Sequence, residues 1–270
     1  MKKRVIVLAL LLLFGIGFVL NAFFGNPISK MLAERASQSY VSENYSDMGY
    51  EVESVAYDFK FTQYYAHARV SGSEDSYFTV TLDMLGNVTG DDYGYRVEAH
   101  ANVANRLALE YKSLVEAVID SDSYPYKVSI GYGMLEFDAE IDAELLEGAV
   151  TRAELVNDGE YDVSELGATN GYIVLYVDSD TVDYSTAAKI ITETADLLSG
   201  AGIKFAMLDF CLEYPAPADD YAQRPDGEIR IRNFKASDIY AEDLENRLIK
   251  AHEETQKYYD SIDKEKAITE

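Results

Sequence analysis

The chain has 270 residues, of which 48 are acidic and 23 are basic, so its formal net charge is −25. A surface this acidic repels nucleic acid and anionic lipid headgroups, and neither is expected as a ligand of the folded part. The single cysteine, Cys211, excludes an internal disulfide. Its apolar neighbours Phe210 and Leu212 predict a buried thiol with a packing role.

An unbroken apolar run from Val5 to Phe24 follows the basic residues Lys2, Lys3 and Arg4. About twenty helical residues span the hydrocarbon core of a bilayer, and the basic cluster favours the cytoplasmic side. The sequence therefore predicts a single-pass signal anchor in the cell membrane, with the bulk of the chain extracytoplasmic and the lipid bilayer as its first partner. A cleaved signal peptide is the alternative, but the run is long and no small-residue cleavage motif follows it.

The next segment predicts a helix followed by an antiparallel meander, in an N-terminal α+β domain over residues 26–122. Asn26-Pro27 opens the helix, and residues 64–70 form the second of the strands that follow it. Gly86-Asn87 allows a tight turn into a short return strand. In the first strand one face carries Val55, Tyr57, Phe59 and Phe61, and in the third the buried face carries Phe78, Val80 and Leu82.

From Tyr95 to Ile119 the apolar period changes to steps of three and four, which predicts a long packing helix. We expect Ala104, Ala108 and Tyr111 on this helix to cover the buried face of the third strand. The recurring apolar positions are Val97, Ala101, Ala104, Ala108, Tyr111, Val115 and Val118. The polar break that follows places a domain boundary between residues 122 and 123.

A second α+β domain is predicted over residues 123–262, followed by a frayed tail at 263–270. Its expected strands lie at 128–132, 149–156, 172–177, 203–214 and 229–232, and its expected helices at 184–199 and 241–259. The continuous apolar run of the strand at 172–177 is typical of a strand covered on both faces.

Residues able to carry chemistry are scattered. His67, His100 and His252 fall on three separate predicted elements, without the spacing that places two imidazoles on one helical face for zinc. The acidic loop that includes Asp178 and Asp183 lacks the glycine and glutamate of a calcium-binding loop, and helix capping by Asp183 explains part of it. The sequence therefore assigns no catalytic, cofactor-binding or metal-binding residue.

One local basic cluster stands out from the acidic remainder, and it includes Arg224, Arg230, Arg232 and Lys235. Arg230 and Arg232 alternate with Ile229 and Ile231 on a predicted strand, so both guanidiniums share one face and could contact a partner. Charge that protects an edge strand from aggregation explains the same pattern.

Several short motifs resemble the YfjL-like family of membrane-anchored proteins from Gram-positive bacteria. They are Gly25-Asn26-Pro27-Ile28-Ser29-Lys30, Tyr57-Asp58-Phe59-Lys60, Tyr77-Phe78-Thr79-Val80 with Gly86-Asn87-Val88, and Asn105-Arg106-Leu107 before Glu110-Tyr111. The resemblance covers about the first 115 residues well. It implies an N-terminal and a C-terminal domain in an uncharacterised family, with no catalytic residue to carry over. The helix and meander also look like PepSY and cystatin-like modules, by architecture alone.

These observations predict a non-enzymatic binding or regulatory module of the cell envelope, with another envelope protein as a partner. The alternative is an envelope hydrolase acting on a cell-wall or peptide substrate. A deep cleft with converging acid and base groups would distinguish the hydrolase from the binding module.

Overall fold

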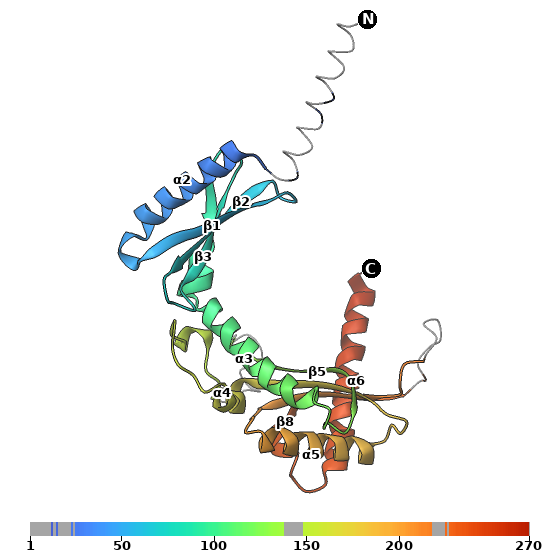
Figure 1. Ribbon diagram of the computed structural model, residues 1–270. Helices are drawn as coiled ribbons and strands as arrows, with labels where there is room; N and C mark the ends of the chain where they lie inside the picture. The colour runs from blue at the N-terminus through green and yellow to red at the C-terminus, as the bar shows by residue number, and fades with distance from the viewer. Residues whose placement is uncertain are drawn as a thin grey trace, which may run out of the picture. The chain divides into compact units, whose positions relative to one another are not determined.

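The computed structural model describes residues 25–137, 148–217, 225 and 227–269, with the isolated positions 12, 15 and 23 (Figure 1). The predicted membrane segment Val5–Phe24 lies almost entirely outside these residues. Across the described ranges, no helix is both long and apolar enough to cross a bilayer. Among the described residues the fold is α+β with two four-stranded sheets, which confirms the α+β part of the predicted fold class.

The chain forms two compact units. Unit 1 comprises the chain up to Val103 together with Val156–Gly159, and unit 2 comprises Ala104–Leu155 and the chain from Glu160 onward. The division therefore falls near the start of helix α3 (Ala101–Ile119), whereas the sequence places the boundary just after that helix.

Unit 1 begins with helix α2 (Pro27–Asn44), which Asn26 caps by accepting a hydrogen bond from the Ser29 amide at 2.8 Å. A short turn η1 (Ser46–Met48) leads into the sheet. Its strands are β1 (Tyr50–Asp58), β2 (Gln63–Val70), β3 (Tyr77–Leu82) and β4 (Val88–Asp91). They pair in chain order and antiparallel, which confirms the predicted helix and meander.

The core of unit 1 lies between α2 and one face of this sheet. Phe78, Val80 and Leu82 are buried as predicted, but they cluster with Ala33 and Val41 of α2. The prediction that Ala104, Ala108 and Tyr111 would cover them is wrong, because all three belong to unit 2. The sequence predicts the core-facing side of this helix at Ile28, Leu32, Ala36 and Tyr40, but the buried side lies one position further on. It consists of Ser29, Ala33, Ser37 and Val41, whose small and polar members make the helix only weakly amphipathic.

Two further expectations about the N-terminal half are wrong. Strand β1 ends at Asp58, so Phe59 and Phe61 lie in an exposed turn and do not continue the face of Tyr57. Helix α3 starts at Ala101 and not at Tyr95, because a π-helical turn η2 (Gly94–Glu98) and a positive φ of 55° at His100 interrupt the chain. The buried stripe of α3 contains Tyr111 and Val115 as predicted, but Val103, Leu107 and Ile119 complete it in place of Ala104, Ala108 and Val118.

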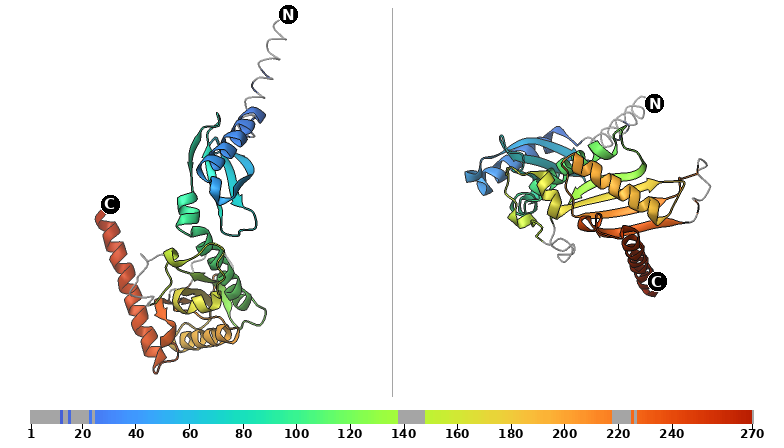
Figure 2. Two further views of the ribbon diagram at one scale, coloured as in Figure 1. Left: turned by 90° about the vertical axis from the view of Figure 1, so that its left-hand side faces the viewer. Right: turned by 90° about the horizontal axis from the view of Figure 1, so that it is seen from below.

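The sheet of unit 2 contains β5 (Lys127–Leu135), β6 (Gly171–Asp178), β7 (Met207–Glu213) and β8 (Glu228–Lys235). These strands pair in chain order, antiparallel except for the parallel pair β6–β7, which helix α5 (Tyr184–Gly200) connects. The other elements are η3 (Arg152–Glu154), α4 (Val163–Asn170), η4 (Ala236–Asp238) and α6 (Leu244–Thr269). Figure 2 shows α5 on one side of the sheet and the C-terminal part of α6 on the other.

Two predicted elements of unit 2 differ from the observed ones. Residues 149–156 form no strand, because the Glu154 carboxylate accepts hydrogen bonds from the amide and hydroxyl of Thr151 and closes the short turn η3. Helix α6 continues through Thr269, beyond its predicted end at Tyr259 and over the tail expected to fray. Lysine and glutamate in this tail are good helix formers, and neither proline nor glycine stops the helix there.

Helix α3 packs closely on β5 because two glycines of that strand lack side chains. A Cβ atom added at Gly133 would lie 2.5 Å from Val115 and 2.9 Å from Tyr111, and one added at Gly131 would lie 2.8 Å from Ile119. The hydroxyl of Tyr111 also donates to the Lys204 carbonyl at 2.7 Å. The glycines therefore set the distance between this helix and its sheet.

Candidate functional site

The outer face of the unit 1 sheet, opposite α2, is hollowed. Because successive side chains of a strand point to opposite faces, burial of Phe78, Val80 and Leu82 directs the residues between them outward. The hollow measures about 840 Å³, and the residues that form its floor are Tyr65, His67, Thr79, Thr81, Thr89 and Gly90. Small threonine and glycine positions leave this space, and their hydroxyl groups supply hydrogen-bond donors and acceptors.

Asp91 and Asp92 edge the hollow, and both hold the fold together. Asp92 accepts from the Thr79 amide at 2.6 Å and pairs with Arg96 at 3.2 Å. Asp91 accepts from the Tyr93 amide at 2.9 Å and from the hydroxyls of Tyr40 and Tyr45.

The tyrosines bound to Asp91 titrate abnormally as a consequence. The hydrogen bond to Asp91, followed by burial, raises the pKa of Tyr40. Burial first and Asp91 second raise the pKa of Tyr45 well above its ordinary value. Both phenols therefore stay protonated near neutral pH and tie the C-terminal end of α2 to β4.

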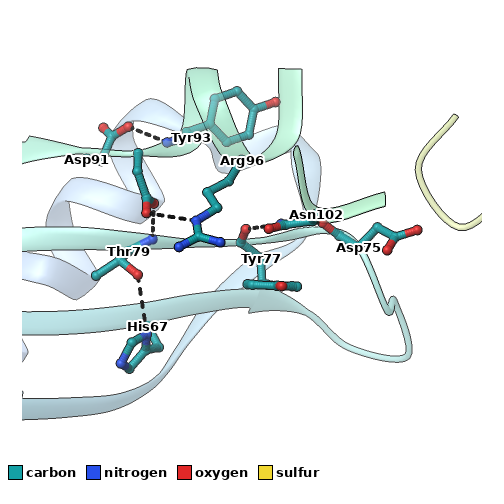
Figure 3. Close-up of polar contacts among 9 residues, drawn as sticks. His67, Asp75, Tyr77, Thr79, Asp91, Tyr93, Arg96 and Asn102 are labelled. Carbon is teal, nitrogen blue, oxygen red and sulfur yellow. Dashed lines mark hydrogen bonds and ion pairs between the residues drawn. The ribbon is translucent and has the colours of Figure 1, made fainter. Parts of the chain in front are cut away.

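His67 is the exposed titratable group of the floor. Its Nδ1 lies 3.4 Å from the hydroxyl of Thr79, at the outer limit of a hydrogen bond (Figure 3). A nucleophilic hydroxyl would need a well-aligned base within about 3.2 Å and a third group to orient that base. The His67–Thr79 pair is therefore better suited to contact a ligand than to activate Thr79.

A band of aromatic and charged groups continues this face toward the β2–β3 turn. The guanidinium of Arg69 lies 5.1 Å from the ring centre of Tyr77 and 4.0 Å from the Glu53 carboxylate. The side-chain amide of Asn102 donates to the carbonyls of Asp75 and Tyr77, both at 2.7 Å. These bonds fix the end of β3 that borders the band.

The segment Val156–Gly159 completes unit 1 from a distant part of the chain. The Asp158 carboxylate accepts from the Ser73 hydroxyl at 2.6 Å and from the amides of Glu74 and Asp75 at 2.7 and 3.1 Å. Asp75 in turn accepts from the Asp158 amide at 2.8 Å. Sequence patterns could not reveal this reciprocal bonding, because the partners are more than eighty positions apart.

The sequence-predicted residues Arg230 and Arg232 lie on β8, where Ile229 and Ile231 are buried as predicted. Both guanidiniums lie against tyrosines of α6. Arg232 lies 4.1 Å from the ring centre of Tyr258, and Arg230 lies 5.7 Å from that of Tyr259 and 3.0 Å from the Glu228 carboxylate. The two arginines thus make contacts within unit 2. The partner contact proposed for them would have to use the part of each guanidinium that these contacts leave exposed.

The three histidines lie on or beside different elements, as predicted, with His67 in β2, His100 before α3 and His252 in α6. His252 has a structural position, because its Nδ1 lies 3.0 Å from both the amide and the carbonyl of Arg230. Thr255 likewise accepts from the Arg232 amide at 3.1 Å. Helix α6 therefore satisfies the backbone groups along the outer edge of β8.

Ligating atoms of Cys211, Glu213 and Glu228 lie within 4.8 Å of one another. Cys211 is fully buried, as predicted, and the cluster includes the Glu228 carboxylate that Arg230 neutralises. A guanidinium thus already supplies the positive charge that a metal would bring.

In the acidic loop, Asp183 caps α5 through the Thr186 amide at 2.7 Å, as predicted, and Asp178 pairs with Lys127 at 2.7 Å.

The fold and this surface define a two-unit α+β protein whose N-terminal sheet carries a helix on one face and a hollow on the other. Comparison with known families gives two matches, YfjL-like, N-terminal domain, over residues 1–92 and YfjL-like C-terminal domain over residues 110–250. The chain belongs to the YfjL-like family, which confirms the resemblance seen in the sequence and extends it through the C-terminal half.

One relative is similar to part of the chain. The protein named Uncharacterized protein YfjL from Bacillus subtilis (strain 168) is 30% identical over 157 residues, which cover 55% of this chain. The match spans 66% of that relative's length, just under two thirds. No solved structure matches the chain.

Proposed function

We propose that the protein is a membrane-anchored, extracytoplasmic binding module of the cell envelope, and that the hollow of unit 1 receives an extended segment of another envelope protein. The anchor is the apolar run Val5–Phe24, and the orientation follows from the basic residues Lys2, Lys3 and Arg4. The observation that carries the binding role is the hollowed outer face of the sheet, whose neighbouring carboxylates are bonded internally.

The chemistry of the hollow favours a polar segment with basic side chains. Threonine hydroxyls on the neighbouring strands β3 and β4 offer hydrogen bonds, and Tyr65 of β2 offers an aromatic surface. Asp58 at the rim and Asp91 behind it carry negative charge, whereas Arg96 pairs with Asp92. Charge complementarity of this kind steers a cationic partner and sets its register. The helix-and-meander order of unit 1 is similar to that of PepSY and cystatin-like modules, which tend to bind or inhibit, and this analogy supports the proposal by architecture alone.

Site-specific photocrosslinking in intact cells tests the proposal. A photoreactive residue at Thr89, an exposed position in the hollow, should give a defined adduct with an envelope protein. Adding Thr81→Arg should abolish the adduct, because the long cationic side chain fills the hollow and repels a basic segment. The matched change Thr181→Arg, at an exposed position of unit 2, should leave the adduct intact. Persistence of the adduct with Thr81→Arg would contradict the proposal.

The alternative function is an envelope hydrolase that acts on a cell-wall or peptide substrate, with His67 and Thr79 as the pair that most resembles a base and a nucleophile. The 3.4 Å separation does not favour it. His67→Ala distinguishes the two functions, because it should remove all turnover from a hydrolase and leave the Thr89 adduct of a binding module detectable.

A further inference from the structure

Apolar side chains are exposed at one end of unit 1, where α2 begins. Ile28 is 68% exposed, Phe59 is 59% exposed, Phe61 is 60% exposed and Leu85 is 74% exposed. They come from α2, the β1–β2 turn and the β3–β4 turn, so they are distant in the sequence. Exposed apolar groups gathered at one end of a small unit are typical of a contact surface.

Several contacts place these groups where the chain leaves the predicted membrane segment. The rings of Phe23 and Phe59 are 5.6 Å apart between centres, and the Tyr64 hydroxyl donates to the Asn26 carbonyl at 3.3 Å. In an antiparallel meander the first and third turns share one end of the sheet, and a Cβ atom at Gly86 would lie 3.0–3.1 Å from Leu32 of α2. Figure 1 shows the start of α2 and the β1–β2 turn at this end.

Both turns are held in shape by an aspartate at their start. Asp58 accepts from the amides of Lys60 and Phe61 at 2.8 and 3.3 Å. Asp83 accepts hydrogen bonds from the amides of Leu85 and Asn87 at 2.8 and 2.9 Å. Hydrogen bonds from Asn87, mainly from its side chain, lower the pKa of Asp83. The turns are therefore preformed, so a partner that buries them need not order them first.

The opposite end of unit 1 has a different composition. Its β2–β3 turn reads Ser71-Gly72-Ser73-Glu74-Asp75 and is bonded to Asp158. Helix α2 has 18 residues and so separates the two ends by about 27 Å. Lys60, whose ammonium lies 5.4 Å from the ring centre of Phe61, adds a positive charge at the apolar end.

The geometry points to a lipid surface as the occupant of this apolar end: Phe59, Phe61 and Leu85 enter the interfacial layer of the bilayer that holds the anchor. This inference rests on the proposed membrane anchor. The contact between Phe23, at the end of the apolar run, and Phe59 supports it. If Phe23 lies at the surface of the bilayer, the β1–β2 turn that carries Phe59 lies there too. Aromatic rings with a neighbouring lysine suit the boundary between acyl chains and headgroups. The acidic remainder of the chain opposes binding to anionic lipid, so the contact depends on the tether and on apolar burial.

The absence of tryptophan from the sequence provides a direct test. The full chain is reconstituted in phosphatidylcholine nanodiscs, with one tryptophan introduced at a time and with bromine placed at known depths on the acyl chains. Phe61→Trp should show blue-shifted emission and strong quenching by shallow bromines. Met48→Trp, at an exposed position at the other end of α2, should stay unquenched with emission typical of water.

A third variant separates this inference from the anchor itself. Leu12→Trp, inside the apolar run, should be quenched by deep bromines if residues 5–24 cross the bilayer. Quenching at position 12 with no difference between positions 61 and 48 would overturn the docking of the turns and leave the anchor standing. A lack of quenching at position 12 would overturn both. Position 61 is exposed, so its substitution should preserve the thermal transition, which is checked first.

Discussion

The polar faces of the two sheets are covered to different extents. In unit 1, α2 covers the apolar face and the other face forms a hollow of about 840 Å³. In unit 2, α3 packs on the face that carries Gly131 and Gly133, and α6 places Tyr258 and Tyr259 against the arginines of the other face. The comparison shows that a polar sheet face is available for a ligand in unit 1, whereas in unit 2 the chain's own helix occupies much of it.

The largest expected effect comes from the core of unit 1. Val80→Asp places a carboxylate at a fully buried position beneath α2 and should lower the free energy of unfolding by about 3 kcal/mol or more, because the charge has no partner there. Chemical denaturation of the full chain in detergent measures the loss. Thr89→Asp, at an exposed position of β4, is the control and should change stability by less than about 0.5 kcal/mol. Equal stability of the two variants would refute the assigned register.

A change of intermediate size tests the packing of unit 2. Gly133→Ala adds a Cβ that meets Val115 and Tyr111 below 3.0 Å, so α3 must shift, at a cost of about 1–3 kcal/mol. Gly200→Ala, where a Cβ meets nothing within 4 Å, should be neutral or slightly stabilising. The two melting temperatures decide the matter, and a destabilisation that is the same for both glycines would exclude close packing of α3 as its cause.

The edge of β8 provides a smaller test of how α6 closes unit 2. Thr255→Val keeps the shape of the side chain but removes the acceptor of the Arg232 amide, which should cost about 1–2 kcal/mol. Hydrogen exchange of the Arg232 amide should become faster in the variant. Unchanged exchange at Arg232 would show that α6 does not protect this edge.

Variants of Arg230 and Arg232 on β8 test whether these arginines bind a partner or only stabilise unit 2. Arg232→Ala removes the stacking on Tyr258 and should lower stability by about 0.5–1 kcal/mol. If Arg230 and Arg232 instead serve a partner, Arg230→Glu with Arg232→Glu should abolish co-purification of that partner and leave the melting temperature nearly unchanged. We expect the melting temperature to fall.

The smallest expected effect depends on pH. Burial raises the pKa of Asp209 on β7, although the Asn233 amide and Arg232 oppose the shift. The folded state therefore binds a proton more tightly than the unfolded state does. Asp209 should lower stability as pH rises from the ordinary aspartate pKa through the raised one. Asp209→Asn should flatten this dependence and raise the melting temperature at neutral pH, and an unchanged pH profile would contradict the shift.

Local sequence patterns predicted much of each sheet, and long-range contacts account for what they missed. The alternation of Phe78, Val80 and Leu82 and the cap at Asn26 are set by neighbours in the chain, and both were predicted. The buried side of α2 was predicted one position too early because it is built from small residues such as Ala33 and Ser37. The stripe of α3 was misplaced because alanine occurs on both its buried and its partly exposed sides.

The candidate site was harder to predict than the fold. Alternation along β3 places Thr79 and Thr81 on one face, but no spacing along the sequence brings Thr89 of β4 and His67 of β2 beside them. Arg230 and Arg232 were visible as an alternating pair, but the tyrosines of α6 that contact them lie more than twenty residues further along the chain. Such contacts depend on tertiary structure, which local periodicity does not specify.

Cysteine labelling in intact cells tests the central claim most directly, that the outer face of the unit 1 sheet is covered by a partner in the envelope. The buried native Cys211 should stay silent toward a membrane-impermeant maleimide, so single cysteines at Thr89→Cys and at the exposed control Thr181→Cys can be compared. We predict that both positions are labelled rapidly in the purified protein, and that in cells Thr181→Cys still reacts rapidly while Thr89→Cys is protected. Equal labelling of both positions in cells would contradict the account.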